Sequence, residues 1–237
     1  MSLLSGENRR KLEQIIGYSF RKPAYLETAL IHSSYRKQKE GAGEKCPLGD
    51  YERQEFLGDA VLELVTSEYL FDHYPGWTEG ELTKERARIV CEASLSYIVK
   101  KNDIHRFMIL SNGEEKTGGR VRPSILCDVF EAIAGGIYLD AGLEEARGYI
   151  RRMLLDHIEE LPAEKSDNFK SKLQELLQGE GKGRPEYEVI REEGPTNNRT
   201  FTMRVLVEGK PVATAVGRSK KQAEQLAAEK ALAKLQA

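Results

Sequence analysis

Cysteine is scarce in this sequence, with three residues among 237. Cys46, Cys91 and Cys127 are odd in number and far apart, and their spacing fits neither a disulfide framework nor a zinc site. Such usage is typical of a reducing compartment, so we expect a cytoplasmic protein. Apolar runs of membrane-spanning length are also missing, and the N-terminus turns polar too soon for a signal peptide. We therefore expect no membrane association.

A strong net charge is lacking too, since the formal value is −2. The charges are nevertheless unevenly distributed. Residues 166–237 hold 13 Lys and Arg against 10 Asp and Glu, whereas residues 1–165 hold 23 against 28. The C-terminal part therefore tolerates a polyanionic partner, and the N-terminal part gathers carboxylates.

Residues 1–160 have the periodicity of an almost entirely helical domain. Apolar residues recur there at spacings of three and four, as in Leu57, Val61 and Leu64. We expect strong helices from Ser124 to Leu139 and from Leu143 to Ile158. The polar stretch Lys37–Gly49 and several Pro and Gly residues separate the helices.

The pattern changes after a short polar segment, residues 161–166, which we interpret as a linker. Residues 167–237 begin with a short amphipathic helix and continue with alternating apolar residues, as in Phe201, Met203, Val205 and Val207. Gly209-Lys210 is a plausible hairpin turn, and an alanine-rich helix from Ser219 to Leu235 closes the chain. We expect a small α+β domain of order α-β-β-β-α.

One helix carries an unusual set of acids, in the segment YERQEFLGDAVLEL. Glu52, Glu55, Asp59 and Glu63 fall on one face. A solvated face is the ordinary explanation for such a pattern. However, Glu55–Asp59 and Asp59–Glu63 are like-charge pairs four residues apart, each of which destabilises a helix by roughly 0.2–0.5 kcal/mol.

A second helix makes the case for a cation. In SILCDVFEAIAGGIYLD, Asp128 and Glu131 are the only charges between Ser124 and Leu139, and small residues that would admit another helix flank them. Burying unpaired carboxylates is costly. A cluster of oxygen ligands from two crossing helices would favour Mg²⁺, with Mn²⁺ as a substitute. Such an ion suits phosphodiester hydrolysis. The predicted ligands are Glu55, Asp59, Asp128 and Glu131.

These motifs resemble the ribonuclease III family. The segment ERQEFLGDAVLEL is similar to the family signature, and ALIHSSY, EGELTKERARIV and RPSILCDVFEAIAGGIYLD match further blocks. SKKQAEQLAAEKAL resembles a double-stranded-RNA-binding domain. The resemblance implies an all-α endonuclease domain (1–160) followed by an RNA-binding domain (167–237). It also implies a homodimeric, Mg²⁺-dependent enzyme, without a small-molecule cofactor, that cuts both strands of double-stranded RNA.

The resemblance further implies 5′-phosphate and 3′-hydroxyl ends with short 3′ overhangs, and processing of precursor ribosomal and other structured RNAs. Position by position, Asp59 and Glu131 match the catalytic acids of the family, and Glu52 and Glu79 match acids that line the active-site valley. Phe56 matches an aromatic residue that inserts into the partner subunit, although a core phenylalanine would read the same way. Two departures, Gln54 for leucine and Tyr51 for asparagine, are expected to leave the chemistry unaffected.

The closing helix has cations at its positive end, where they are unfavourable unless an anion docks. The resemblance assigns Arg218, Lys220 and Lys221 to RNA phosphates, although a solvated charge run remains an alternative. It assigns Lys170, Gln174 and Glu175 to one minor groove. Asn197, where histidine is frequent, is assigned to a neighbouring minor groove.

Two other classes of function agree less well with the sequence. A non-catalytic RNA binder would have no reason to keep Asp128 and Glu131 on an apolar helix. A phosphohydrolase acting on small nucleotides would leave the C-terminal domain unexplained. His32 is interpreted as a hydrogen-bonded structural residue and not as a ligand.

Overall fold

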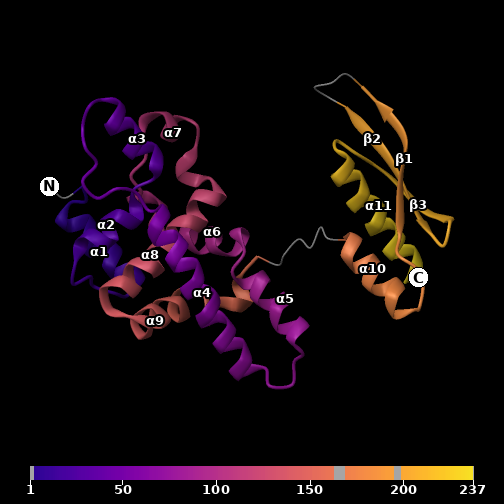
Figure 1. Cartoon of the computed structure of the whole chain (residues 1–237), viewed down its shortest axis with the longest axis horizontal. Coiled ribbons are helices and arrows are strands. Elements are labelled where there is room, and N and C mark those ends of the chain that lie inside the picture. The colour runs from indigo at the N-terminus through magenta and orange to yellow at the C-terminus, as the bar shows by residue number, and fades with distance from the viewer. Residues whose placement is uncertain (1–2, 163–168, 195–198, 237) are drawn as a thin grey trace. The chain divides into compact units, whose positions relative to one another are not determined.

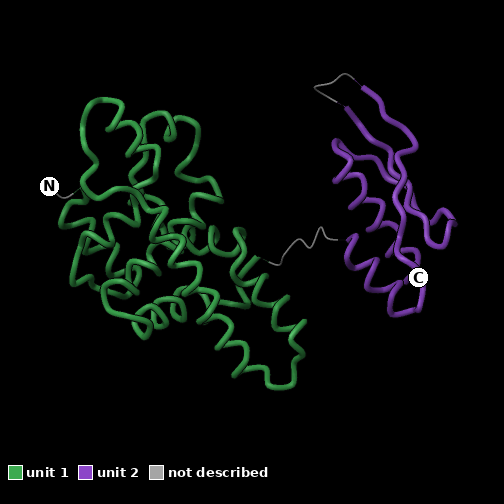
Figure 2. Tube along the Cα trace, viewed as in Figure 1, with its two compact units in different colours: residues 1–163 green, residues 164–237 purple. Residues whose placement is uncertain are grey.

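The computed structural model describes residues 3–162, 169–194 and 199–236. The chain divides into two compact units, residues 1–163 (the helical unit) and 164–237 (the α+β unit), which Figure 2 shows in different colours. Each unit has a hydrophobic core of its own. No described helix combines the length and hydropathy needed to cross a membrane. Most of the predicted linker, residues 161–166, lies outside the described residues.

The first unit is helical, as the sequence predicted (Figure 1). Short 3₁₀ turns at Ile104–Phe107, Gly119–Val121 and Leu155–Glu160 connect or extend its helices. The helices are α1 (Gly6–Ile16), α2 (Pro23–Leu30), α3 (Ser33–Gly41), α4 (Glu52–His73), α5 (Glu79–Ile89), α6 (Glu92–Lys101), α7 (Asn112–Lys116), α8 (Pro123–Ala141) and α9 (Leu143–Met153).

Helix α8 is the centre of this unit and packs against α2, α4, α6 and α9. Its crossing with α4 is so close that two glycines are required. A Cβ atom at Gly58 would lie 1.8 Å from the carbonyl oxygen of Glu131, and one at Gly135 would lie 2.2 Å from that of Gln54. The two main chains are therefore in direct contact. Gly135 belongs to the small residues from which the sequence predicted a close helix approach.

Two expectations about boundaries need correction, and the interpretation of His32 as a hydrogen-bonded structural residue is confirmed. The helix predicted over Leu143–Ile158 ends at Met153. Leu154 and Leu155 are both buried, and adjacent residues of one continuous helix point in directions about 100° apart. A break in the helix allows both side chains to enter the core. Helix α3 extends into the polar stretch as far as Gly41. His32 forms the N-terminal cap of α3, where its Nδ1 accepts a 3.2 Å hydrogen bond from the backbone N–H of Ser34.

The α+β unit has the predicted order, α10 (Phe169–Gly179), β1 (Glu186–Glu193), β2 (Thr200–Val207), β3 (Lys210–Gly217) and α11 (Lys220–Leu235). The strands form an antiparallel sheet in the order β1-β2-β3. Its inward residues, such as Met203 and Val205, pack with alanines of α11 and leucines of α10. The hairpin turn falls one residue earlier than predicted, at Glu208-Gly209, where both residues have positive φ, as a type I′ turn requires.

Candidate metal and RNA sites

The crossing of α4 and α8 brings three carboxylates together. Oxygen atoms of Glu55, Asp128 and Glu131 lie within 4.8 Å of one another, and we call these residues the acidic cluster. Glu55 belongs to the first turn of α4, and Asp128 and Glu131 lie one turn apart on α8. The direct contact of the main chains at Gly58 and Gly135 is what allows acids from the two helices to approach so closely.

The acidic cluster holds negative charge in a poorly solvated position. Glu131 is only 9% exposed, and burial, followed by the charge of Asp59, raises its pKa to about 8. Burial also raises the pKa values of Glu55 and Asp128. Within the described part of the chain, no Lys or Arg forms an ion pair with these three acids. An all-oxygen donor set with unbalanced charge fits a hard divalent cation.

The other predicted acids, Asp59, Glu52 and Glu79, lie outside the acidic cluster. Asp59 is exposed and outside the tight group, yet its charge is the one that most raises the pKa of Glu131. Glu52 is exposed one turn before Glu55, whose pKa its charge also raises. Glu79 begins α5, where it is exposed and accepts a 3.0 Å hydrogen bond from the hydroxyl of Thr83. The structure thus gathers Glu55, Asp128 and Glu131 directly and Asp59 beside them.

The two departures from the family pattern have different consequences. Gln54 is buried, and its amide donates to the carbonyl oxygens of Tyr25 and Ala132, at 3.0 and 3.2 Å, without touching an acid. Tyr51 is also buried, but its hydroxyl donates a 2.9 Å hydrogen bond to Oδ2 of Asp128. Tyr51 therefore contacts the site directly, while the expectation that this departure leaves the chemistry unaffected stays a prediction. No sequence pattern predicts this contact, because the partners are 77 residues apart.

Stability should depend on pH through Glu131 in buffer without divalent ions. Its pKa is about 8 in the folded chain, against an ordinary value of 4.5. Between these values the folded chain holds a proton that the unfolded chain has released, so the free energy of unfolding falls as pH rises. In urea melts with EDTA, we expect this fall to be steeper for the unmodified chain than for Glu131→Gln. Equal slopes for the two proteins would contradict the assignment.

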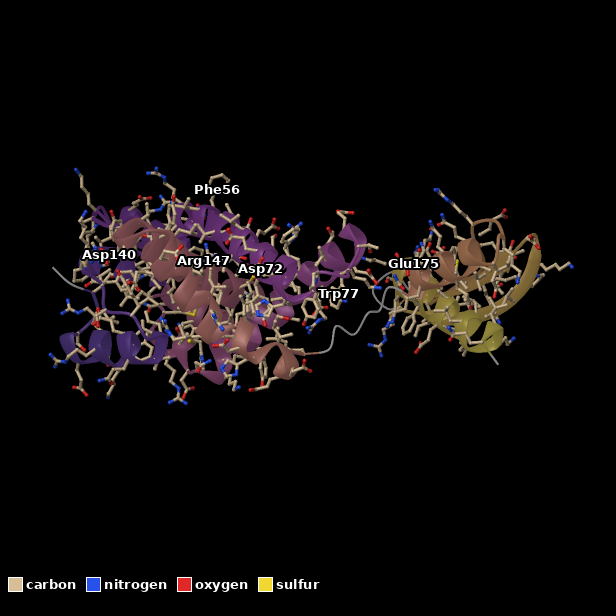
Figure 3. All side chains as sticks on the ribbon, turned by 90° about the horizontal axis from the view of Figure 1, so that it is seen from below. Phe56, Asp72, Trp77, Asp140, Arg147 and Glu175 are labelled. Carbon is tan, nitrogen blue, oxygen red and sulfur yellow. The ribbon has the colours of Figure 1, made fainter. Side chains whose placement is uncertain are left out.

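Phe56 lies on the outer surface of the helical unit. Its side chain is 79% exposed, which rules out the core alternative, and Figure 3 shows it at the edge of the molecule. A pocket of about 680 Å³ lies beside it on the same unit. Arg53, Gln54 and Leu57 of α4 and Leu139 of α8 contribute to the pocket lining. A large exposed aromatic side chain is the kind of residue that anchors protein–protein interfaces.

In the α+β unit, three predicted RNA-binding residues share one depression. The α10–α11 groove, of about 400 Å³, is lined by Lys170 and Gln174 of α10 and by Lys221 of α11, together with Arg184 and Tyr187. The ammonium of Lys170 lies 4.7 Å from the centre of the Tyr187 ring and 2.7 Å from a carboxylate oxygen of Glu224. Arg184 was missed by sequence reasoning, because a single cation in a polar turn carries no periodic signal.

The start of α11 is built to present backbone N–H groups and cations. Ser219 caps the helix, and its hydroxyl accepts a 3.1 Å hydrogen bond from the N–H of Gln222. Arg218, Lys220 and Lys221 are all exposed there. Glu175 is exposed on α10 (Figure 3). Asn197 lies outside the described residues.

These features define a class of protein. A helical unit supplies a buried carboxylate site suited to a divalent cation, and a separate α-β-β-β-α unit supplies a cationic helix start suited to phosphates. The combination is typical of a nuclease that carries its own nucleic-acid-binding domain.

Comparison with known proteins gives the family. A family model described as Ribonuclease-III-like matches residues 22–158, and one described as double-stranded RNA binding motif matches residues 169–235. The chain is 45% identical to ribonuclease 3 of Bacillus cytotoxicus over 226 residues, which cover 95% of this chain and 91% of that protein. It is 46% identical to ribonuclease 3 of Bacillus cereus over 223 residues, with coverage of 94% and 89%.

A solved structure of the nuclease domain of ribonuclease III from Campylobacter jejuni is similar to the helical unit. It is 41% identical, with a TM-score of 0.57, and the match covers 65% of this chain and 99% of that domain. That structure is described as showing flexibility in a region involved in dimer formation. The chain belongs to the ribonuclease III family of endoribonucleases, which cleave double-stranded RNA.

Proposed function

We propose that this chain is a Mg²⁺-dependent homodimer that cuts both strands of double-stranded RNA, leaving 5′-phosphates, 3′-hydroxyls and short 3′ overhangs. Precursor ribosomal RNA and other structured RNAs are the proposed substrates, and the cytoplasm is the proposed location. The observation that carries the proposal is the acidic cluster, whose carboxylate oxygens lie within 4.8 Å of one another and form no ion pair with a Lys or Arg among the described residues. Unbalanced buried carboxylates are costly unless a cation or proton joins them.

Four residues would hold the ion, namely Glu55, Asp59, Asp128 and Glu131. Mn²⁺, which accepts the same oxygen ligands, would substitute for Mg²⁺. When bound, the ion supplies an acidified water molecule and offsets the charge that grows on the scissile phosphate. Asp59 and Glu131 are proposed as the catalytic acids of the set. Their mutual repulsion, seen in the raised pKa of Glu131, favours uptake of a cation over two isolated negative charges.

Glu52 and Glu79 are proposed to extend the acidic surface around these ligands. Glu52 lies one turn from Glu55 on α4, and Glu79 begins a different helix outside the acidic cluster. The family resemblance places such residues on opposite sides of a valley formed by two subunits. In that arrangement Glu79 would act beside the ligands of the partner subunit.

The α+β unit is proposed to hold the duplex by its backbone. Arg218, Lys220 and Lys221 would contact phosphates from the exposed start of α11, where the helix dipole adds to their charge. Lys170, Gln174 and Glu175 on α10, and Asn197, would contact minor-groove sugars. Contacts of this kind follow the shape of A-form RNA and not its base sequence. Arg184, which shares the α10–α11 groove, is a further candidate.

A second copy of this chain is the proposed partner of Phe56. The ring is 79% exposed, and the neighbouring pocket of about 680 Å³ can receive an aromatic side chain. A two-fold axis would place each Phe56 in the pocket of the other subunit. The region of dimer formation described for the Campylobacter jejuni nuclease domain supports a dimer in this family.

Phe56→Ala should weaken this dimer. Truncating a central aromatic anchor typically costs about 2–4 kcal/mol, which corresponds to a dissociation constant raised roughly 30-fold or more. Sedimentation equilibrium of the full chain would measure the change. The matched control is Val216→Ala, which shortens a 56% exposed apolar side chain in the other unit and should leave the association unchanged. Equal association of all three proteins would remove Phe56 from the interface.

The function is tested with a long perfect RNA duplex in Mg²⁺, with the matching single strand and an EDTA reaction as controls. We expect the duplex to be cut and the single strand to stay intact, and we expect EDTA to stop the cleavage. The products should be joined by RNA ligase without prior phosphorylation, because their ends carry 5′-phosphates and 3′-hydroxyls. A chain that binds the duplex in Mg²⁺ or Mn²⁺ and never cuts it would be an RNA binder, and the catalytic proposal would fail.

A further inference from the structure

Tyr51 takes part in the geometry of both helices that supply the acids. Its main chain starts α4: the Tyr51 N–H donates to the carbonyl oxygen of Ile31 at 3.0 Å. Its own carbonyl oxygen accepts from the N–H groups of Gln54 and Glu55, at 2.8 and 2.9 Å. Tyr51 thereby fixes where the helix begins, and with it the positions of Glu55 and Asp59 one and two turns later.

The side chain of the same residue reaches the other helix. Its hydroxyl donates a 2.9 Å hydrogen bond to Oδ2 of Asp128 on α8. Tyr51 is 3% exposed, so water competes little for this bond, and the ring of His32 lies 5.7 Å away, centre to centre. A hydrogen bond to a carboxylate in such surroundings is stronger than one between neutral groups. The bond therefore restrains the orientation of the Asp128 carboxylate.

We infer that Tyr51 is a positioning residue that sets Asp128 against the acids of α4 for capture of the divalent cation. This inference rests on the proposed function of the acidic cluster. A carboxylate has two oxygens, so Asp128 can accept the hydrogen bond of the Tyr51 hydroxyl on Oδ2 and still offer Oδ1 to a cation. The hydroxyl donates to the carboxylate form of Asp128, which is the form that binds a cation.

The effect should appear first in metal affinity. Removing an outer hydrogen-bond partner of a metal ligand typically weakens metal binding about 10–100-fold. Tyr51→Phe deletes the hydroxyl and keeps the ring against His32 and the helix start. We therefore expect a Mn²⁺ dissociation constant raised roughly tenfold or more in the absence of RNA. We also expect a cleavage defect that shrinks as Mg²⁺ is raised, since the acids themselves remain.

The matched control is Tyr149→Phe. Tyr149 is a fully buried tyrosine of the same unit, and its hydroxyl has no hydrogen-bond partner among the described residues. Its removal should leave Mn²⁺ affinity within about twofold of the unmodified chain. Duplex binding in EDTA should be equal for all three proteins, because the RNA-binding groups belong to the α+β unit.

Mn²⁺ binding is measured on the full-length chain by electron paramagnetic resonance of the free ion, with thermal melts in EDTA to confirm folding. A second measurement uses the ultraviolet absorption of the unmodified chain. Binding of a cation at Asp128 changes the hydrogen bond that Tyr51 donates, so adding Mg²⁺ should change the tyrosine absorption spectrum. That difference should persist in Tyr149→Phe. Its absence from an unmodified chain that binds the ion would overturn the inference even if Tyr51→Phe failed to fold.

The outcomes also separate this inference from the proposed function. If the unmodified chain binds Mn²⁺ and cuts duplex RNA while Tyr51→Phe matches it at every ion concentration, the positioning role is wrong and the nuclease stands. If the unmodified chain neither binds Mn²⁺ nor cuts, the function itself fails. A defect in Tyr51→Phe that persists at saturating Mg²⁺ would also contradict a role in ion capture.

Discussion

Glu131→Gln should lose at least about a thousandfold in the rate of duplex RNA cleavage while keeping its affinity for the RNA. The substitution preserves size and removes the charge of the most buried acid in the cluster, which is 9% exposed. Loss of one charged ligand removes several kcal/mol of transition-state stabilisation at a divalent-ion site. RNA binding should survive, because the groups proposed to grip the duplex lie in the separate α+β unit.

The measurement compares single-turnover cleavage in Mg²⁺ with gel-shift binding of the same duplex. Glu27→Gln is the matched control, since Glu27 is a buried glutamate of the same unit, 4% exposed, and lies outside the acidic cluster. It should cut at close to the unmodified rate. Glu131→Gln cleaving at a comparable rate would show that this carboxylate is dispensable, and the assignment of the active site would have to change.

Gly58→Ala should destabilise the helical unit by more than about 3 kcal/mol and abolish cleavage. The added methyl carbon would lie 1.8 Å from the carbonyl oxygen of Glu131, whereas ordinary contacts begin at 3.4 Å. The obstacle is main chain, so no side chain can rotate aside, and α4 and α8 must move apart. Separation of the helices would also draw Glu55 away from Asp128 and Glu131.

Gly80→Ala provides the control for helix propensity. Gly80 also lies in a helix, α5, and a Cβ there would meet nothing within 4 Å. Alanine should leave stability unchanged or raise it by up to about 1 kcal/mol. Urea melts followed by circular dichroism would compare the two variants. Similar midpoints for Gly58→Ala and the unmodified chain would show that the helix crossing is looser than its geometry indicates.

Fold class was readable from the sequence because it depends on local periodicity. The three- and four-residue spacing of apolar residues, as in Leu57 and Val61, predicted the helical unit, and the alternation through Met203 and Val205 predicted the sheet. Element ends were less predictable. The end of α9 at Met153 is decided by how Leu154 and Leu155 bury in the tertiary structure, and periodicity along one helix does not contain that information.

The acids of the site could be found because charge on an apolar helix is conspicuous. Asp128 and Glu131 stood out in the sequence for that reason, and the structure places them with Glu55. Tyr51 could not be found in the same way. A tyrosine at a helix start is unremarkable until the fold brings it against a residue 77 positions later.

The contact between Gly58 and Gly135 has a consequence for how the ion preference of this site could be altered. Because the two main chains touch there, the distance between the helix axes of α4 and α8 is set by the glycine contact. The spacing between the metal-binding side chains on the two helices therefore does not depend on which side chains they are. Exchanging one acid for histidine would replace a hard oxygen ligand by a softer nitrogen ligand and leave the distance between the two helices unchanged. The preference of the site among divalent ions could therefore be altered by substituting one metal-binding side chain at a time, with the helix crossing kept as it is.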